Sequence, residues 1–422
     1  MNLDLSIALL LYMLFIAITL YYFSNLSMEN IKWMKSLEVK KVVTSLVSEI
    51  FSFSNLEGKE VEFPYPLSLS IKYPSLLFSV FDVSGHNRVN EPVLISLDLD
   101  EECLNRVRKG TIRIYDEDFN EIPFRFVKEE FCKENYLRKA TLFFETNTSR
   151  FSSRKFRLIF SNISSLELKN YENVSDILLL LTFDDYENIG YDFSGNNNHG
   201  KIYGNPTLTE GKFGMGLSLD EDYISIESNL TLLLDTELTI SLWIKPNNPL
   251  GEKQTIIANS PSIGEYNYWI YLENSSLKVS VFSTEESNLV IPEVFNDTEW
   301  YYIVVRVKNK TIEVFINGEK VGEGESGENK WREGYTYIGS LGEERGTWFN
   351  GTVDEVRIYR RALSNEEIIS HFYNPLEVCI FPVEEIDVIS FEKILLLKDF
   401  SYNVLKELRF TNYNFRVEIY EK

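Results

Sequence analysis

Short runs of alternating apolar and polar residues recur along this chain, most densely between residues 178 and 374. Alternation over about four to eight residues predicts half-buried β-strands, because successive side chains of a strand point to opposite faces of its sheet. Many short strands separated by turns indicate a sandwich or barrel, so the predicted fold class is mostly β. The clearest runs are Tyr223–Ile226, Thr239–Ile244, Leu277–Phe282, Tyr301–Val307 and Thr311–Ile316.

Two local signals sharpen this prediction. Asn317-Gly318 stands between two alternating runs and predicts a tight hairpin, since both central positions of such a turn need a positive φ. Ser364 precedes Asn365-Glu366-Glu367, which predicts a short helix whose first turn is closed by a capping box between Ser364 and Glu367.

Larger pieces follow one another in a fixed order between residues 178 and 374. They include Leu178–Thr182 with Phe183, Asp184 and Asp185; the polar turn Asp192–Gly200; Gly211–Asp220; the strands around Trp243 and Trp300; and Phe349–Tyr359. This order resembles the laminin-G-like, or concanavalin A-like lectin/glucanase, jelly roll of surface and secreted proteins. The resemblance implies an antiparallel jelly-roll sandwich over 178–374.

The N-terminal region predicts a membrane anchor. Leu5–Phe23 contains no charge, and a membrane-spanning helix needs about 20 predominantly apolar residues. A cleavable signal peptide is the alternative, but it requires a basic start, and this N-terminus has Asp4 and no basic side chain before the apolar run. We therefore expect an uncleaved transmembrane helix within residues 1–27.

Two features of the sequence disagree about orientation. Lys32, Lys35, Lys40 and Lys41 follow the predicted span and favour a cytoplasmic location for the bulk of the chain. Nine Asn-x-Ser/Thr sequons and the resemblance to a surface domain favour the outside. We expect a single-pass protein of the cell membrane whose bulk is extracytoplasmic.

The rest of the chain divides into three further segments. Residues 28–86 predict an amphipathic helix and a small β-piece, and with the anchor they resemble archaeal pilin-type surface proteins. Residues 87–161 predict a smaller β-domain, similar through Pro92, Asp116 and Pro123 to a domain that precedes laminin-G-like domains in archaeal and bacterial surface proteins. Residues 375–422 form a β-rich segment that the sequence leaves unassigned.

Net charge narrows the class of binding partner. The chain has 42 Lys+Arg against 64 Asp+Glu, a net charge of -22, which repels phosphate backbones and argues against nucleic acid as a partner.

The three cysteines cannot all pair with one another. Cys103 and Cys132 lie close enough in sequence to predict a disulfide, with two buried thiols as the alternative. Cys379 is left over, and we expect it to be buried.

Carboxylates at both ends of the jelly roll suggest a structural calcium ion, because calcium takes six to eight oxygen ligands. In this fold class the first and last strands lie side by side, which would bring Asp184 or Asp185 near Asp354, with Asp220 from another edge. The alternative is that Asp184 and Asp354 accept hydrogen bonds from loop amides and hold no ion.

Aromatic residues in or beside the expected loops suggest a carbohydrate platform, since sugar rings stack on exposed aromatic faces. The candidates are Trp331, Trp348, Tyr335 and Trp269. The alternative for each tryptophan is burial under its own loop.

No catalytic arrangement is evident, so we predict that the chain is not an enzyme. The nearest string to the acidic motif of related glucanases is Glu385-Ile386-Asp387, which lacks the final acid and lies outside the jelly roll. The predicted function is a membrane-anchored surface protein whose laminin-G-like domain binds a glycan or another surface ligand. The alternative is a structural part of a pilus-like or cell-envelope assembly.

Overall fold

The computed structural model describes residues 67–99, 107–118, 120–132, 136–160, 171, 174–230, 234, 236–261, 265–283, 288–328, 331–342, 347–373, 375–387 and 415–419. The predicted anchor, the predicted amphipathic helix and Cys103 lie outside these residues. Within them, no helix has the length and apolar character needed to cross a membrane.

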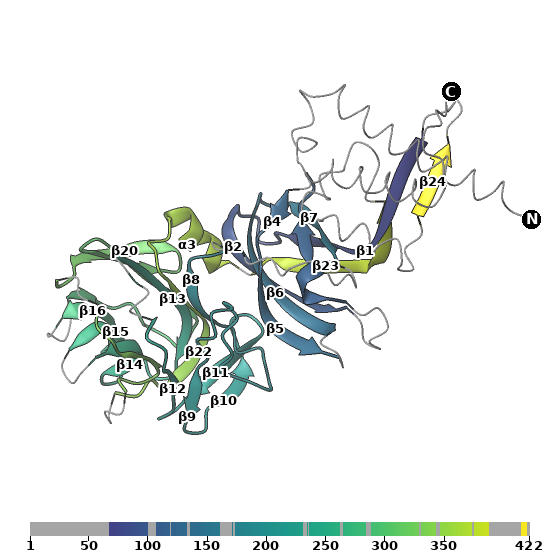
Figure 1. The fold of residues 1–422 in the computed structure, drawn as a ribbon. Coiled ribbons are helices and arrows are strands. Elements are labelled where there is room, and N and C mark those ends of the chain that lie inside the picture. The colour runs from purple at the N-terminus through teal and green to yellow at the C-terminus, as the bar shows by residue number, and fades with distance from the viewer. Residues whose placement is uncertain are drawn as a thin grey trace, which may run out of the picture.

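Two antiparallel sheets form a sandwich from residue 177 to the end of the only α-helix in the described part of the chain (Figure 1). One sheet has the order β10 (Thr207–Glu210), β11 (Met215–Leu219), β22 (Gly351–Tyr359), β13 (Glu237–Pro246), β18 (Tyr301–Lys308), β19 (Thr311–Ile316) and β20 (Glu319–Glu325), with β8 (Ile177–Leu181) also paired to β22. The other has the order β17 (Leu289–Ile291), β16 (Ser276–Ser283), β15 (Tyr266–Glu273), β14 (Gln254–Ser260), β21 (Tyr335–Ile338), β12 (Tyr223–Ile226) and β9 (Lys201–Tyr203).

The inner faces of these two sheets enclose the main core. It consists mostly of Leu, Ile and Val from alternate strand positions, such as Ile240 and Leu242 of β13 and Ile303 and Val305 of β18. Period-two patterning therefore decides which side chains enter the core. The predicted mostly β fold with an antiparallel sandwich is confirmed, and its two sheets are consistent with the predicted jelly roll.

The local predictions in the sandwich also hold. Asn317 and Gly318 have φ of 53° and 85°, as the predicted hairpin between β19 and β20 requires. Helix α3 (Asn365–Phe372) begins at Ser364, and both hydrogen bonds of the capping box with Glu367 are present.

A smaller β-domain, which we call the first domain, precedes the sandwich. Its larger sheet has the order β23 (Glu377–Asp387), β1 (Leu67–Phe81), β7 (Ser153–Ile159), β3 (Arg113–Tyr115) and β4 (Glu121–Ile122), and β24 (Phe415–Ile419) pairs with the start of β1. A three-stranded sheet of β2 (Arg88–Asp98), β6 (Leu137–Thr148) and β5 (Arg125–Phe131) covers it, and a 3-10 helix (Lys109–Thr111) lies between the strands.

The first domain differs from the predicted division at 86/87 and 374/375. Strand β1 belongs to the segment predicted as 28–86, yet it pairs with β7 on one side and with β23 on the other. The chain thus leaves the first domain after β7, forms the sandwich, and returns to complete the same sheet. A pattern of alternation identifies each strand but carries no information about its neighbour, so the sequence could not reveal this return.

The cysteines fall in the first domain. Cys132, after β5, is disulfide-bonded. Cys379, on β23, is a free and exposed thiol, so the expectation that it is buried is wrong.

The two domains pack against each other through the outer face of the eight-stranded sheet. Val127 and Phe143 of the first domain join one hydrophobic cluster with Leu180, Tyr359 and Ile368 of the sandwich. Helix α3 lies between the sandwich and β2 in Figure 1, and it contacts that strand. Lys128 of β5 and Asp185 add an ion pair of 3.1 Å across the interface. The outer face of the seven-stranded sheet points away from the first domain (Figure 1).

Candidate functional site

Asp184 and Asp354 meet beside the turn that joins β10 to β11. Strand β8, which ends just before Asp184, pairs with β22, which carries Asp354. Asp184 Oδ1 accepts a hydrogen bond from the Met215 amide at 2.8 Å, and Asp354 Oδ2 accepts one from the Phe213 amide at 3.0 Å. The expectation that the first and last strands lie side by side is therefore confirmed. Both carboxylates hold the backbone of the same turn.

Gly214 allows this close approach. Its φ of 62° is in the left-handed region, and a Cβ at this position would lie 2.2 Å from Asp184 Oδ1. A side chain here would displace the carboxylate from the Met215 amide.

A β-bulge in β22 places two acidic side chains side by side. Val353 and Val356 both enter the core, so the two residues between them both face outward, and Glu355 has a φ of 48°. The pairing with β13 shifts register between Ser241 and Trp243, opposite this point. Burial and the neighbouring Glu355 raise the pKa of Asp354 to about 9. Burial therefore disfavours the ionised form of the Asp354 carboxyl.

The other two predicted calcium ligands lie elsewhere. Asp185 pairs with Lys128 of the first domain, and Asp220 Oδ1 accepts a hydrogen bond from the Asn350 side chain at 2.8 Å. Across the described ranges, no group of three or more His, Cys, Asp or Glu side chains is arranged to hold a metal ion. For Asp184 and Asp354 the geometry matches the alternative, in which they hold loop amides.

Calcium binding stays a prediction that a melting curve can test. If an ion binds only the folded chain, calcium at a hundredfold excess over Kd stabilises it by about 2.7 kcal/mol. The melting temperature of the full-length chain should then fall with chelator and recover with calcium. Asp354→Ala should remove that response, whereas Asp220→Ala should keep it. Identical curves with chelator and with calcium would exclude the ion.

Two of the four predicted platform residues are packed side chains. Trp269 was expected in or beside a loop, but it lies within β15, is only 3% exposed, and donates through Nε1 to Thr255 Oγ1 at 2.9 Å. Trp331 packs against the edge of the core, with its ring 4.3 Å from that of Phe282. For Trp269 the alternative of burial is correct, because removing a large apolar ring from water is favourable. Trp331 is half-buried, and its role in a platform stays a prediction.

Trp348 belongs to a row of aromatic side chains on the outer face of the seven-stranded sheet. The rings of Tyr203 on β9 and Tyr223 on β12 are parallel within 1° and 4.6 Å apart. The ring centre of Tyr223 is also 5.7 Å from that of Trp348 and 6.1 Å from that of Tyr337 on β21. All four rings are half-buried. We call these four residues the aromatic row. Tyr335, which we also predicted, is two positions before Tyr337 on the same face and is exposed.

Polar groups border the aromatic row. The Tyr203 hydroxyl donates to Glu227 Oε1 at 3.0 Å, and Lys201 Nζ lies 3.3 Å from the same oxygen. Asp222 accepts a hydrogen bond from the Asn205 amide at 2.7 Å. These groups present both donors and acceptors beside flat apolar rings.

Tyr203, Tyr223 and Tyr337 were not among the predicted ligand residues. They occupy the outward positions of the strand patterns Lys201-Ile202-Tyr203, Tyr223-Ile224-Ser225 and Tyr335-Thr336-Tyr337-Ile338. A tyrosine at an outward position was the available signal. It could not show that three such positions belong to the adjacent strands β9, β12 and β21.

The acidic string considered for glycosidase chemistry lies far from this face. Glu385-Ile386-Asp387 is part of β23, which pairs with β1 in the first domain. That the chain is not an enzyme stays a prediction.

Comparisons with known proteins agree with this architecture. Residues 219–369 match Laminin_G_3, a family described as the concanavalin A-like lectin/glucanases superfamily. A search of curated protein sequences finds no match to the chain.

Similar solved structures include domain 4 of AbnA, an extracellular arabinanase from Geobacillus stearothermophilus, in complex with arabinotriose. It has 20% identity and a TM-score of 0.38, over 46% of this chain and 97% of that one. The receptor binding domain of botulinum neurotoxin mosaic serotype C/D has 17% identity and a TM-score of 0.39, over 47% of this chain and 50% of that one. The binding domain of botulinum neurotoxin DC in complex with SialylT has 16% identity and a TM-score of 0.38, and this chain spans 50% of it.

The family match over residues 219–369 supports the laminin-G-like resemblance drawn from the sequence for that part of the chain.

Proposed function

We propose that this protein binds a carbohydrate on the aromatic row of its lectin-like domain, and that it does so as a membrane-anchored protein whose bulk is extracytoplasmic. The observation that carries the proposal is the set of four half-buried rings on adjoining parts of one sheet face, bordered by Glu227, Lys201 and Asp222. The family match supports a lectin-like role for this domain. Fractionation of cells that express the full-length chain tests the anchor.

The chemistry of the aromatic row suits a sugar. Flat rings stack on the C–H faces of pyranose or furanose units, and neighbouring polar groups hydrogen-bond the hydroxyls. The net charge of -22 disfavours acidic polysaccharides through long-range repulsion. Uncharged and amino-substituted glycans are therefore the expected class.

Removing a central ring of the aromatic row should weaken binding with little loss of stability. Each ring stacked on ligand contributes on the order of 1–3 kcal/mol, so Tyr223→Ala and Trp348→Ala should each raise Kd about tenfold or more. Tyr186→Ala is a matched control, because Tyr186 is 70% exposed and lies outside the row. A glycan array identifies the ligand, and calorimetry on the full-length variants measures Kd.

The outcomes separate the two candidate functions. Equal binding by wild type and both row variants would place the site elsewhere on the domain. The absence of any bound glycan on the array would favour the structural alternative, a displayed spacer in an envelope or pilus-like assembly. One observation fits that alternative: Leu67 at the start of β1 pairs with Ile419 of β24, on the side of the first domain away from the sandwich (Figure 1).

A further inference from the structure

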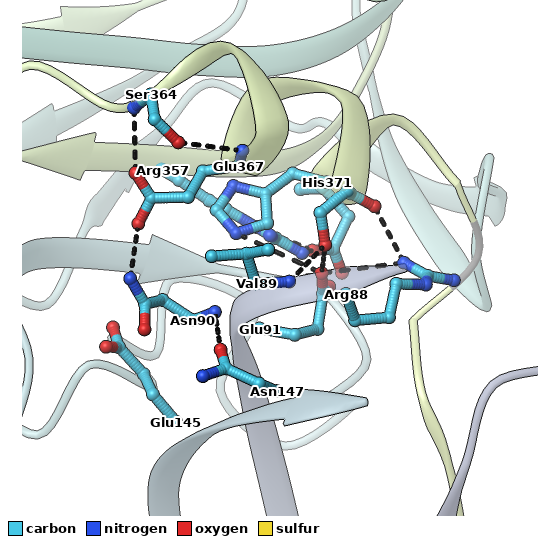
Figure 2. Close-up of polar contacts among 12 residues, drawn as sticks. Arg88, Val89, Asn90, Glu91, Glu145, Asn147, Arg357, Ser364, Glu367 and His371 are labelled. Atoms are coloured by element: carbon cyan, nitrogen blue, oxygen red, sulfur yellow. Dashed lines mark hydrogen bonds and ion pairs between the residues drawn. The ribbon is translucent and has the colours of Figure 1, made fainter. Parts of the chain in front are cut away.

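A buried polar pocket joins the first domain to the sandwich. Arg88 and Glu91 reach from β2 to helix α3, where Arg88 Nη1 donates to the Ser370 carbonyl at 2.7 Å and the Ser370 hydroxyl donates to Glu91 Oε2 at 2.5 Å (Figure 2). His371 Nε2 lies 4.0 Å from the same Glu91 oxygen. The side chains of Arg88, Glu91 and His371 are at most 1% exposed. The pocket is therefore closed to bulk water while the domains are docked.

Several polar atoms in this pocket have no hydrogen-bond partner in the part of the chain that the structure describes. They include Glu91 Oε1, both ring nitrogens of His371, Arg357 Nη1 and the hydroxyls of Tyr302 and Tyr359. A buried carboxylate oxygen without a donor and a buried imidazole can each take up a proton. Glu91 and His371 are thus the groups whose protonation is free to change.

The charges around them are already matched. Arg88 pairs with Asp82 at 2.8 Å, and Arg357 pairs with Glu355 at 2.6 Å. One proton on either Glu91 or His371 leaves the whole group neutral. The state without a proton has a net charge of minus one, and the state with two protons has a net charge of plus one. In both states water is absent and cannot solvate the charge. Because an uncompensated buried charge is strongly unfavourable, the state with one proton is the stable one.

The remaining ionisable groups near this pocket form a second set on the other side of Asn90, where Asn90 Nδ2 donates to Glu367 at 2.7 Å (Figure 2). In that set Arg361 pairs with both Glu367 and Asp176. Glu145 of β6 accepts a hydrogen bond from Ser175. The hydroxyls facing the pocket from β18 and β22 belong to Tyr302 and Tyr359, and burial raises the pKa of both above its ordinary value.

We propose that Glu91 and His371 hold a single proton in common while the two domains are docked, and that this proton confines stable docking to a window of pH. The two side chains come from different domains, so the shared proton exists only in the docked state. Separation of the domains exposes both groups to water, where each titrates independently.

The limits of the window follow from proton counting. Burial raises the pKa of Glu91 above its ordinary 4.5, and burial together with Arg357 lowers the pKa of His371 well below its ordinary 6.5. Below pH 4.5 the exposed groups bind two protons and the docked pair binds one, so stability rises with pH. Between 4.5 and 6.5 both states bind one proton and stability is level. Above 6.5 the exposed groups bind none, and stability falls until the docked pair loses its proton.

The test is the pH dependence of urea unfolding of the full-length chain, compared with E91Q, H371Q and the double variant E91Q/H371Q. At each pH, the free energy of unfolding of the double variant is subtracted from that of each other protein, which cancels the contributions of all other groups. After this subtraction, wild type should lose stability both below pH 4.5 and above pH 6.5. Its unfolding equilibrium constant should change about tenfold per pH unit in each range. E91Q should lose the alkaline decline and begin its acid decline at pH 6.5. H371Q should lose the acid decline and begin its alkaline decline at pH 4.5.

A second measurement needs no variant. The chain has only three histidines, so selective isotope labelling gives three imidazole signals by NMR. The His371 signal of the wild-type protein should not titrate between pH 5 and 8. Titration near 6.5 would overturn the proposal, as would parallel pH profiles for wild type and the double variant, which would mean that the two residues have a packing role alone.

Discussion

Arg88→Met is expected to lower the free energy of unfolding by roughly 3–5 kcal/mol, because it leaves buried carboxylates without their cation. The Arg88 side chain is 0% exposed and lies between Asp82 and Glu91. Asp82 also accepts hydrogen bonds from the amides of Gly85 and Phe151, so two loops of the first domain depend on its orientation. Methionine fills much of the same volume, which limits the contribution of a cavity to the loss.

Arg154→Met is the matched control for this prediction. The Arg154 side chain is 35% exposed and lies 3.4 Å from Asp116, which keeps its hydrogen bonds from the Asp118 and Asn120 amides when the charge is removed. Arg154→Met should lower the free energy of unfolding by about 1 kcal/mol or less. Urea unfolding of the full-length chain near pH 5.5 measures both. Similar losses for Arg88 and Arg154 would show that the buried pairing is not a major contribution to stability.

Asp354→Asn is expected to change how the free energy of unfolding depends on pH more than it changes that free energy at any single pH. The Asp354 carboxyl, with a pKa raised to about 9, keeps a proton in the folded chain that the unfolded chain releases near its ordinary 3.8. The folded state binds more protons between these values, so wild-type stability falls as pH rises through them. Asparagine carries no such proton, so the variant should lack this decline in the free energy of unfolding. The decline that is absent should amount to roughly 2 kcal/mol or more between pH 5 and 9.

The same substitution has a separate constant effect. Asp354 accepts from the Phe213 and Glu355 amides, one on each oxygen, and asparagine keeps only one acceptor, so the variant should lose about 1–3 kcal/mol at pH 5. Asp220→Asn controls for the loss of a charge, because Asp220 is exposed. Unfolding in urea at a series of pH values separates the two effects. A pH profile parallel to that of wild type would mean that Asp354 is ionised in the folded protein.

Asp354 and Asp184 show how far reasoning from fold class reaches. Their proximity was predicted because the first and last strands of a jelly roll are neighbours, and β8 and β22 are paired. The consequence of that proximity was not predictable, because it depends on the bulge at Glu355 and on which loop amides face the two carboxylates.

Trp269 and Tyr223 show that the burial of outward-facing aromatic residues could not be predicted from the sequence. Both lie in strands on the outer side of the same sheet, yet Trp269 is buried and Tyr223 is half-buried within the aromatic row. Leu341 and Tyr266 pack with Trp269, and Leu341 is distant in sequence. Composition and alternation cannot tell which outward face a later loop will cover.

The sequence by itself determined the local structure of this protein: strand positions by alternation, the Asn317-Gly318 hairpin, and the start of α3 at Ser364. These features depend on residues within a few positions of one another, where backbone sterics and hydrogen bonding decide the outcome. Only the tertiary structure decided the return of β23 to β1, the aromatic row, and the burial of Glu91 against His371. Each of these joins segments far apart in the chain, and the pairing of distant strands and surfaces is selected by the packing of the whole molecule.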